Sequence, residues 1–300
     1  MSFVFTLASL GVVFAISMLV VSRIQDRKRR AAPRITQSEL DGYWGAIHAA
    51  RLPFAKIYVG ADHPLLAAQS RIGGLPFAEM GRETWPSGGV DGLPMQFLAQ
   101  INFADMAGLD GFPAKGLLQL FGAVDERGAL DNLEDPSARV LRWFPDPQGD
   151  RTLPLPDSLA TAKHSVFSKR ALHEGLTLGF ELGQAPGNPS NDEFLDLAPD
   201  DRSRMGETEA VQAQLGRAFA DKEAQILEGY GVHWVGGHPS FTQNDVRIDP
   251  ETRKLDRVVL HLGFDDNVCL GDAGELNLLI SKEDLAGQDF SNAVCFWDCY

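Results

Sequence analysis

Two matching segments, far apart in the chain, constrain the fold most strongly. Ile-Gly-Gly-Leu-Pro at residues 72–76 returns as Val-Gly-Gly-His-Pro at residues 235–239. These two segments are 163 residues apart, and the matches beyond them are separated by 161, 158 and then 154 residues. Shorter loops in a second copy would produce this drift. Because the apolar periodicity of each strand pair is also kept, the sequence predicts an internal duplication. The further matches pair 99–103 with 260–264, 115–121 with 273–279, and 140–143 with 294–297.

Local patterns predict helices at two places and strands elsewhere. Thr36-Gln-Ser-Glu39 is a capping box, and apolar residues then follow at helical spacing up to Pro53. A second amphipathic helix is expected at 206–228, whereas 146–206 is rich in Pro, Gly, Asn and Asp, which is typical of loops. The predicted fold class is α+β, with a predominantly antiparallel sheet, or two sheets, and flanking helices. Strands are expected at 56–59, 95–103, 116–121 and 139–144.

The N-terminus contains an uncharged apolar segment. Phe3 to Ser22 holds twenty residues without a charge, and 23–34 then carries six basic residues and one acid. A helix of that length rises roughly 30 Å, enough to cross a bilayer. A cleaved signal peptide would need basic residues before the apolar run, and a buried helix is rarely apolar on every side. We therefore expect one transmembrane helix at 3–22 with a basic juxtamembrane segment. The positive-inside rule places the rest in the cytoplasm, at a bacterial inner membrane.

The remaining chain is strongly acidic. Without residues 1–34 it keeps 21 basic and 40 acidic residues, a net charge of −19. Nucleic acid is an improbable partner for such a surface, because phosphate binding needs positive charge. We expect a single domain at 35–300, with related halves at 54–145 and 232–300 joined by the loop-rich segment and the second helix.

Several blocks of sequence resemble a known family. The blocks IGGLPF, FLAQINFAD and KGLLQLF in the first half, with VGGHPSFTQND and GDAGELNLLISKEDLAGQDFSNA in the second, are similar to the YwqG-like family of bacterial proteins. The resemblance covers most of residues 54–300. It implies an α+β fold with related halves, and no activity, because this is a domain of unknown function. Some members occur in neighbourhoods linked to secreted toxins, which implies an accessory or immunity-type role. Leu270 in place of an aromatic residue, the Trp-Asp-Cys-Tyr end and the N-terminal segment depart from the family pattern.

Polar residues in the first half give one set of candidate contacts. Gln100 and Asn102 lie on the strand face opposite Ile101 and Phe103, and Asp105 follows. Such a face lines a ligand cleft or is the solvated side of an antiparallel sheet.

The second half offers a similar set. Gln243 and Asp245 follow the second Gly-Gly-x-Pro, where they contact a ligand or cap their own turn. Asp272, in Gly-Asp-Ala-Gly, binds a cation with its neighbours or stabilises a turn, and it lacks calcium-loop spacing.

Recognisable catalytic chemistry is missing from the sequence itself. It contains neither a nucleophile elbow nor a phosphate-binding loop. Cys295-x3-Cys299 and the histidines 233, 238 and 261 lack zinc spacing, so we expect no metal and no cofactor. The leading interpretation is a non-catalytic module that binds a protein or a small ligand. The alternative is an enzyme such as a hydrolase, whose site would assemble between the halves from Asp105, His238, Asp245 and Asp272.

Overall fold

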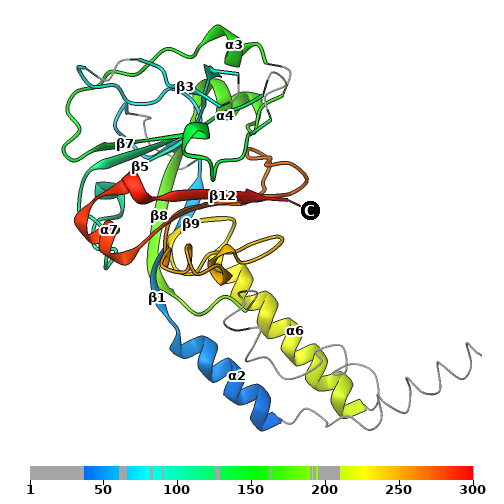
Figure 1. Ribbon diagram of the computed structural model, residues 1–300. Coiled ribbons are helices and arrows are strands. Elements are labelled where there is room, and N and C mark those ends of the chain that lie inside the picture. The colour runs from blue at the N-terminus through cyan, green and yellow to red at the C-terminus, as the bar shows by residue number, and fades with distance from the viewer. Residues whose placement is uncertain are drawn as a thin grey trace, which may run out of the picture. The chain divides into compact units, whose positions relative to one another are not determined.

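The computed structural model describes residues 37–60, 66–81, 84–89, 91–125, 129–162, 164–189, 191, 194 and 210–299 (Figure 1). The helices are α2 (Gln37–Ala49), α3 (Asp157–Ala160), α4 (Lys169–Glu174), α6 (Ala210–Tyr230) and α7 (Lys282–Gly287), with 3-10 turns η1 (Phe103–Met106), η2 (Pro136–Ala138), η4 (Val246–Ile248) and η5 (Phe290–Asn292). The strands are β1 (Leu52–Val59), β2 (Arg71–Ile72), β3 (Ser87–Gly88), β4 (Leu93–Pro94), β5 (Gln96–Asn102), β6 (Leu117–Gly122), β7 (Arg139–Phe144), β8 (Leu176–Ala185), β9 (His233–Gly236), β10 (Arg257–Leu262), β11 (Glu275–Ile280) and β12 (Val294–Asp298).

A single antiparallel sheet of ten strands dominates the molecule. Its order is β12-β11-β10-β9-β1-β8-β2-β5-β6-β7, and β3 and β4 form a separate two-stranded ribbon. The α+β fold class expected from the sequence is therefore wrong, since the described residues form a mostly-sheet fold with few helices. The physical reason is that β1 and β8 pair along eight positions in the centre and join the remaining strands into one sheet.

Four strands lie on each side of this central pair. We call β2, β5, β6 and β7 the first wing, and β9, β10, β11 and β12 the second wing. The register is the same in both. Gln100 of β5 faces Gln119 of β6, and His261 of β10 faces Asn277 of β11. Each of these ladders also carries a register shift, between Phe97 and Ala99 in one and between Val258 and Leu260 in the other.

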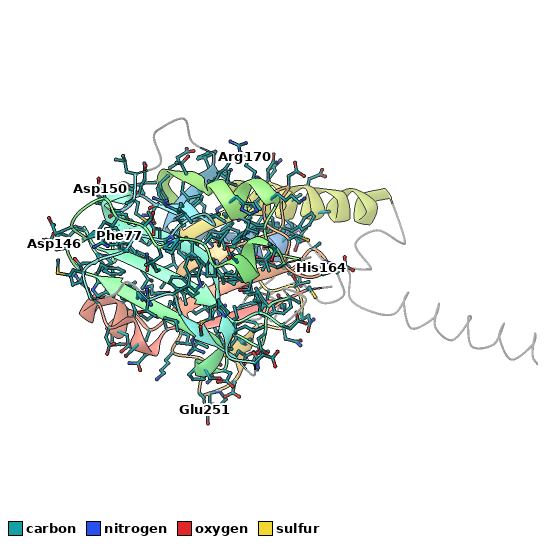
Figure 2. All side chains as sticks on the ribbon, turned by 90° about the horizontal axis from the view of Figure 1, so that it is seen from above. Phe77, Asp146, Asp150, His164, Arg170 and Glu251 are labelled. Carbon is teal, nitrogen blue, oxygen red and sulfur yellow. The ribbon has the colours of Figure 1, made fainter. Side chains whose placement is uncertain are left out.

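The two edge strands of the sheet approach each other. The indole Nε1 of Trp297 on β12 donates to the carbonyl of Asp131, in the segment between β6 and β7, at 2.8 Å. The ring centroid of Trp143 on β7 lies 4.8 Å from that of Phe290 in η5, just before β12. The sheet is thus nearly closed on itself, and one large core draws buried residues from both wings, including Leu120 and Leu278. Figure 2 shows Phe77 among the packed side chains, with Asp150, Arg170 and Glu251 at the periphery.

Strand β8 lies in the region expected to consist of loops. Leu176 and Leu178 are 3% and 1% exposed, whereas Leu182 near the other end is 44% exposed. The alternation in LTLGFEL is a strand pattern, and the flanking Pro, Gly and Asn residues obscured it.

Buried polar side chains hold a loop over the first wing. The guanidinium of Arg71 is 2% exposed and donates to the carbonyls of Leu66, Ala67, Gln69 and Leu75. Burial lowers the pKa of Arg71 to about 10, so the group remains charged at neutral pH. We call residues 66–70 and 73–77, which flank β2, the first strap. The strap covers the polar face of β5, so both faces of this strand are buried.

The chain divides into two compact units. The larger comprises residues 46–196 and 225–300 and holds every strand that the structure describes, and the sites below belong to it. The predicted apolar stripe of α2 is buried, with Leu40, Tyr43, Trp44 and Ile47 at most 5% exposed. Within the described residues, every helix is too short or too polar to span a bilayer. The span predicted at 3–22 lies outside those residues.

Candidate functional site

A loop also crosses the face of the second wing. We call residues 236–245 the second strap. It begins at Gly236, whose φ is +74° and where a Cβ would lie 2.3 Å from the carbonyl oxygen of Pro53, so glycine is required. The side-chain amide of Asn277 donates to the carbonyl of Ser240 at 2.6 Å, and that of Asn188 donates to Pro239 at 2.9 Å. These bonds fix the strap above β11 and β12.

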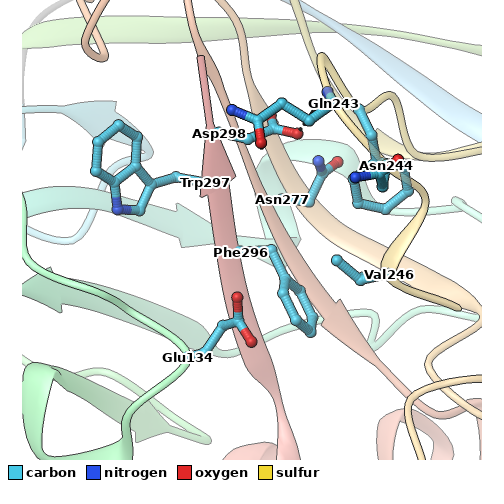
Figure 3. Close-up of a pocket in the computed structure, with 9 residues that line it drawn as sticks. Glu134, Gln243, Asn244, Val246, Asn277, Phe296, Trp297 and Asp298 are labelled. Carbon is cyan, nitrogen blue, oxygen red and sulfur yellow. Dashed lines mark hydrogen bonds between the residues drawn. The ribbon is translucent and has the colours of Figure 1, made fainter. Parts of the chain in front are cut away.

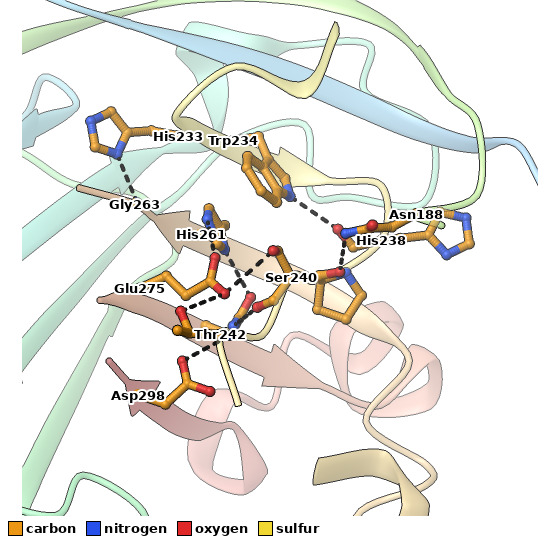
Figure 4. Close-up of polar contacts among 12 residues, drawn as sticks. Asn188, His233, Trp234, His238, Ser240, Thr242, His261, Gly263, Glu275 and Asp298 are labelled. Carbon is orange, nitrogen blue, oxygen red and sulfur yellow. Dashed lines mark hydrogen bonds and ion pairs between the residues drawn. The ribbon is translucent and has the colours of Figure 1, made fainter. Parts of the chain in front are cut away.

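Two carboxylates lie side by side under this strap. Glu275 on β11 is the direct ladder partner of Asp298 on β12. The hydroxyls of Ser240 and Thr242 donate to Glu275 Oε1 at 3.3 and 3.1 Å (Figure 4). The backbone amides of Thr242 and Gln243 donate to the two oxygens of Asp298 at 3.3 and 2.9 Å. The strap therefore brings both acids together through its hydrogen-bond donors.

Burial shapes the ionisation of Glu275. Burial raises the pKa of its carboxyl above the ordinary value, the hydroxyl bonds from Ser240 and Thr242 oppose this, and the nearby charge of Asp298 adds to it. The side chain is only 14% exposed. The two acids thus form a partly desolvated pair of like charges.

A buried histidine lies behind this pair. His261 is 2% exposed, and its ring stacks on Trp234 with centroids 3.5 Å apart. Because Asn277 gives its amide hydrogen to Ser240, its oxygen faces His261 Nδ1 at 3.0 Å and accepts from it. His261 Nε2 then faces Glu275 Oε2 at 3.5 Å. Burial lowers the pKa of His261 to about 3, although the hydrogen bond that its Nδ1–H donates to Asn277 acts to raise the pKa, so the imidazole is neutral at pH 7.

The positions in the first wing that correspond to Glu275 and Asp298 hold apolar side chains. There the ladder partners are Leu117 and Phe144, and the strap residue above them is Phe77. Phe77 and Phe144 meet edge-on with centroids 5.2 Å apart, and all three side chains are at most 1% exposed. Glu275 and Asp298 replace this pair in the second wing. The fold is therefore able to fill this position with hydrocarbon, so the polar version is not a requirement of the architecture.

A cavity of about 180 Å³ opens beside the polar cluster. Figure 3 shows Glu134 beside Phe296 at one end, and Asp298 with Gln243 at the other. The cavity is lined by two acids, three amides, three aromatic rings and one aliphatic side chain, which are Glu134, Asp298, Gln243, Asn244, Asn277, Phe241, Phe296, Trp297 and Val246. We call it the β12 cavity. A second cavity of about 270 Å³ lies across Trp297 and includes His164, Ser165 and the exposed Cys269.

Residues 70–299 match the family model described as a domain of unknown function, DUF1963. The chain belongs to the DUF1963 family. This membership is consistent with the YwqG-like resemblance, and that finer name stays a prediction. The search of curated proteins found no match. The fold and the site just described are thus those of a DUF1963 domain, and the function has to be argued from the geometry.

The first-half candidates of this DUF1963 domain hold the first strap. Gln100 is fully buried, accepts from the amide of Phe77 and donates to the carbonyls of Ala67 and Gln69. Asn102 donates to Ala68 and caps η1, and Asp105 accepts from the amide of Ser70. This strand face is neither solvated nor an open cleft, because the strap covers it. A ligand role for these three residues stays a prediction.

The second-half candidates lie in different surroundings. Gln243 lines the β12 cavity and donates to the carbonyl of Cys299 at 2.8 Å. Asp245 caps η4 and pairs with Arg247 at 2.6 Å, whereas Asp272 is exposed in a turn. His238 contacts the carbonyl of Ala50 at 2.7 Å. The residues expected to converge in a hydrolase thus bond to different partners, and none of Asp105, His238, Asp245 and Asp272 lines the β12 cavity.

Sequence reasoning missed Glu275, Asn277 and Asp298. A signal was present, because Glu275 is the one acid in the apolar strand ELNLLI and stands 158 residues after Leu117, its match in the first half. An acid in the second half at a position where the first half has leucine indicates that this position is polar in one half only. Asp298 was overlooked because the match of the last strand ended at Trp297.

Proposed function

We propose that this DUF1963 domain is a non-catalytic binding module whose ligand occupies the β12 cavity. One observation carries the proposal, which is that Glu275 and Asp298 stand where the first wing has Leu117 and Phe144. The two wings share their register, so the comparison is made at one position of one ladder. Acids at positions where the fold also accepts apolar residues indicate a binding site, because the fold does not require them.

Carboxylates at these two positions stabilise the fold less than the apolar side chains of the first wing do. Burying a carboxylate is unfavourable unless its hydrogen bonds are supplied, and the strap must provide them from Ser240, Thr242 and Gln243. Leu and Phe at the same positions gain from burial instead. Retaining acids here favours a function that uses them.

The arrangement suits binding better than catalysis. The Ser240 hydroxyl donates to Glu275, and His261 Nε2 faces the same carboxylate rather than that hydroxyl. A nucleophilic serine needs the base within hydrogen-bond reach of its own oxygen. The oxygens of Asp298 accept from backbone amides, which fixes the carboxylate in place. These groups are therefore positioned as fixed contacts for a ligand.

A matched set of small probes tests the binding function. Butylammonium, butyramide and butyrate share one chain and differ in charge. We expect at least one to shift the indole NMR signal of Trp297, which lines the cavity, and to leave unchanged that of Trp85, which packs on Phe121 of the first wing. Gln243→Ala should weaken this probe several-fold, while Gln148→Ala, an exposed glutamine outside the cavity, should not. Trp297→Phe assigns the signal. If no probe shifts Trp297, the cavity is not a binding site.

We further propose that Phe3–Ser22 attaches the module to a bacterial inner membrane, with the domain in the cytoplasm. The uncharged run and the basic residues after it support this proposal. The full chain should sediment with membranes and resist alkaline extraction, and a chain without residues 1–34 should not. Alkaline release of the full chain would disprove membrane attachment without affecting the binding function.

A further inference from the structure

We propose that the ligand of the β12 cavity is an organic cation, a primary ammonium or guanidinium group at the end of a flexible chain. This inference rests on the proposed binding function and names its ligand class. It follows from three properties of the cavity, namely its carboxylates, its rings and its amide oxygens.

The carboxylates of Glu275 and Asp298 have no cationic partner among the described residues, whereas Glu134 is within reach of the charge of Arg139. Glu134 and Asp298 line the cavity, and Glu275 lies behind Asp298 as its ladder partner. Among the residues that the structure describes, no lysine or arginine is paired with Glu275 or Asp298, and the neutral His261 does not offset their charge. Like charges at directly paired strand positions repel, and the charge of Asp298 adds to the raised pKa of Glu275. An incoming cation removes this repulsion, whereas an anion increases it.

Aromatic rings complete the walls. Phe241, Phe296 and Trp297 line the same cavity. Ring faces carry negative electrostatic potential and attract ammonium and guanidinium groups. Rings together with carboxylates recognise organic cations, because the rings contact the alkyl stem while the acids bind the charged end.

The cavity offers hydrogen-bond acceptors for the N–H donors of an ammonium or guanidinium group. Each oxygen of Asp298 accepts one backbone amide, which leaves a second lone pair on each for a ligand. The exposed amides of Gln243 and Asn244 also line the cavity and offer further oxygen acceptors. The cavity volume is about 180 Å³, which is suited to a charged end group with a short chain.

A metal ion fits this site less well. Calcium takes six to eight oxygen ligands. Over the described part of the chain, no three His, Cys, Asp or Glu side chains are grouped so as to hold a metal. The net charge of −14 on the whole chain also attracts cationic ligands from a distance. Two sources carry the inferred group, which are a lysine or arginine side chain of a protein partner and a free polyamine.

The test titrates the full chain, in detergent, with butylammonium, butylguanidinium, butyramide and butyrate. The two cations should bind more tightly than the neutral amide by at least tenfold, and butyrate should bind least. Asp298→Asn should weaken both cations tenfold or more and leave butyramide within twofold. Glu134→Gln changes an exposed side chain and so preserves the fold. It should weaken the cations three- to tenfold. Asp150→Asn, an exposed acid after β7, is the matched control and should change nothing.

Different failures separate the two proposals. If butyramide or butyrate binds in a manner sensitive to Gln243→Ala while the cations do not bind, the cation inference is wrong and the binding function stands. If calcium chloride displaces butylammonium and its own binding is lost in Asp298→Asn, the site holds a metal ion and the inference is also wrong. If no probe binds, both proposals fail.

A last comparison distinguishes a protein side chain from a free polyamine as the source of the cation. A blocked Gly-Gly-Lys-Gly-Gly peptide, its Nε-acetyl form and spermidine are measured against the same variants. A peptide that binds more tightly than spermidine, and loses binding on acetylation, assigns the group to a protein side chain. The reverse order assigns it to a polyamine. Equal binding of the acetylated and free peptides would contradict recognition of the charge.

Discussion

Residues at corresponding positions of the two wings differ in their hydrogen bonds and in whether they can ionise. Gln100 and His261 occupy the same place in their ladders, as do Gln119 and Asn277. In the first wing the side chains of Gln100 and Gln119 bond to the strap and to each other, as far as the described residues show. In the second wing His261 Nδ1 donates to Asn277, and its Nε2 faces the carboxylate of Glu275 at 3.5 Å. One side chain thus decides whether this row is purely structural or also ionisable.

His261 should make the protein sensitive to acid. Its pKa is lowered from 6.5 in the unfolded chain to about 3 by burial. Below pH 6.5 the unfolded chain takes up a proton that the folded chain refuses, so stability is lost as the pH falls from 6.5 towards 3. His261→Gln, which copies Gln100, should remove roughly 3 kcal/mol of the loss between pH 7 and pH 4. Urea unfolding across this range measures it. Parallel curves for the two proteins would contradict the prediction.

Glu275 acts in the opposite direction. Its pKa is raised in the folded chain, so its contribution to stability is present below pH 4.5 and is lost as the pH rises through the folded value. The difference in stability between the natural protein and His261→Gln reports on the histidine alone only if the substitution leaves the pKa of Glu275 unchanged. Repeating the comparison in a Glu275→Gln background provides that control.

At the level of elements, β8 decides how the wings are joined. It pairs with β1 along eight positions and with β2 at Arg71 and Ile72. Each wing would otherwise end at an open edge next to the central strands. The burial of Leu176 and Leu178, which face the core, shows which end of β8 makes this connection.

Two leucines on β8 should therefore differ sharply on truncation. Leu178→Ala leaves a void in the core and should lower the free energy of unfolding by about 2–4 kcal/mol. Leu182→Ala, at a side chain 44% exposed, should cost less than about 1 kcal/mol. Denaturant unfolding of both variants checks this, and similar losses would mean that β8 is not the connecting strand.

For the whole larger unit, the important feature is one core shared between the wings. Buried residues of both wings, such as Leu120 and Leu278, belong to the same cluster. The contacts of Trp297 with Asp131 and of Trp143 with Phe290 tie the two edges of the sheet. A shared core predicts that neither wing unfolds alone.

Truncations in either wing should then have a common effect. Leu120→Ala and Leu278→Ala should each lower the global free energy of unfolding by about 2–4 kcal/mol. Hydrogen exchange should show slow amides of β6 and of β11 losing protection together in both variants. Protection that falls only in the wing carrying the substitution would show two independent folding units.

The sequence by itself determined the local elements. The periodicity of Arg139–Phe144 predicted β7 with the bounds that the structure has, and the apolar stripe of α2 is buried as expected. Local patterns also placed β5 and β6 within a residue or two. These features depend on alternation and capping over a few residues, which are visible in the chain itself.

The tertiary structure alone decided the fold class and the candidate site. Gln100 looked like one polar face of a half-buried strand, and a strap from elsewhere in the chain buries it. Glu275 and Asp298 become neighbours only through the β11–β12 register, and the second strap supplies their hydrogen bonds. Burial and like-charge proximity arise from residues distant in sequence, so no local pattern carries them.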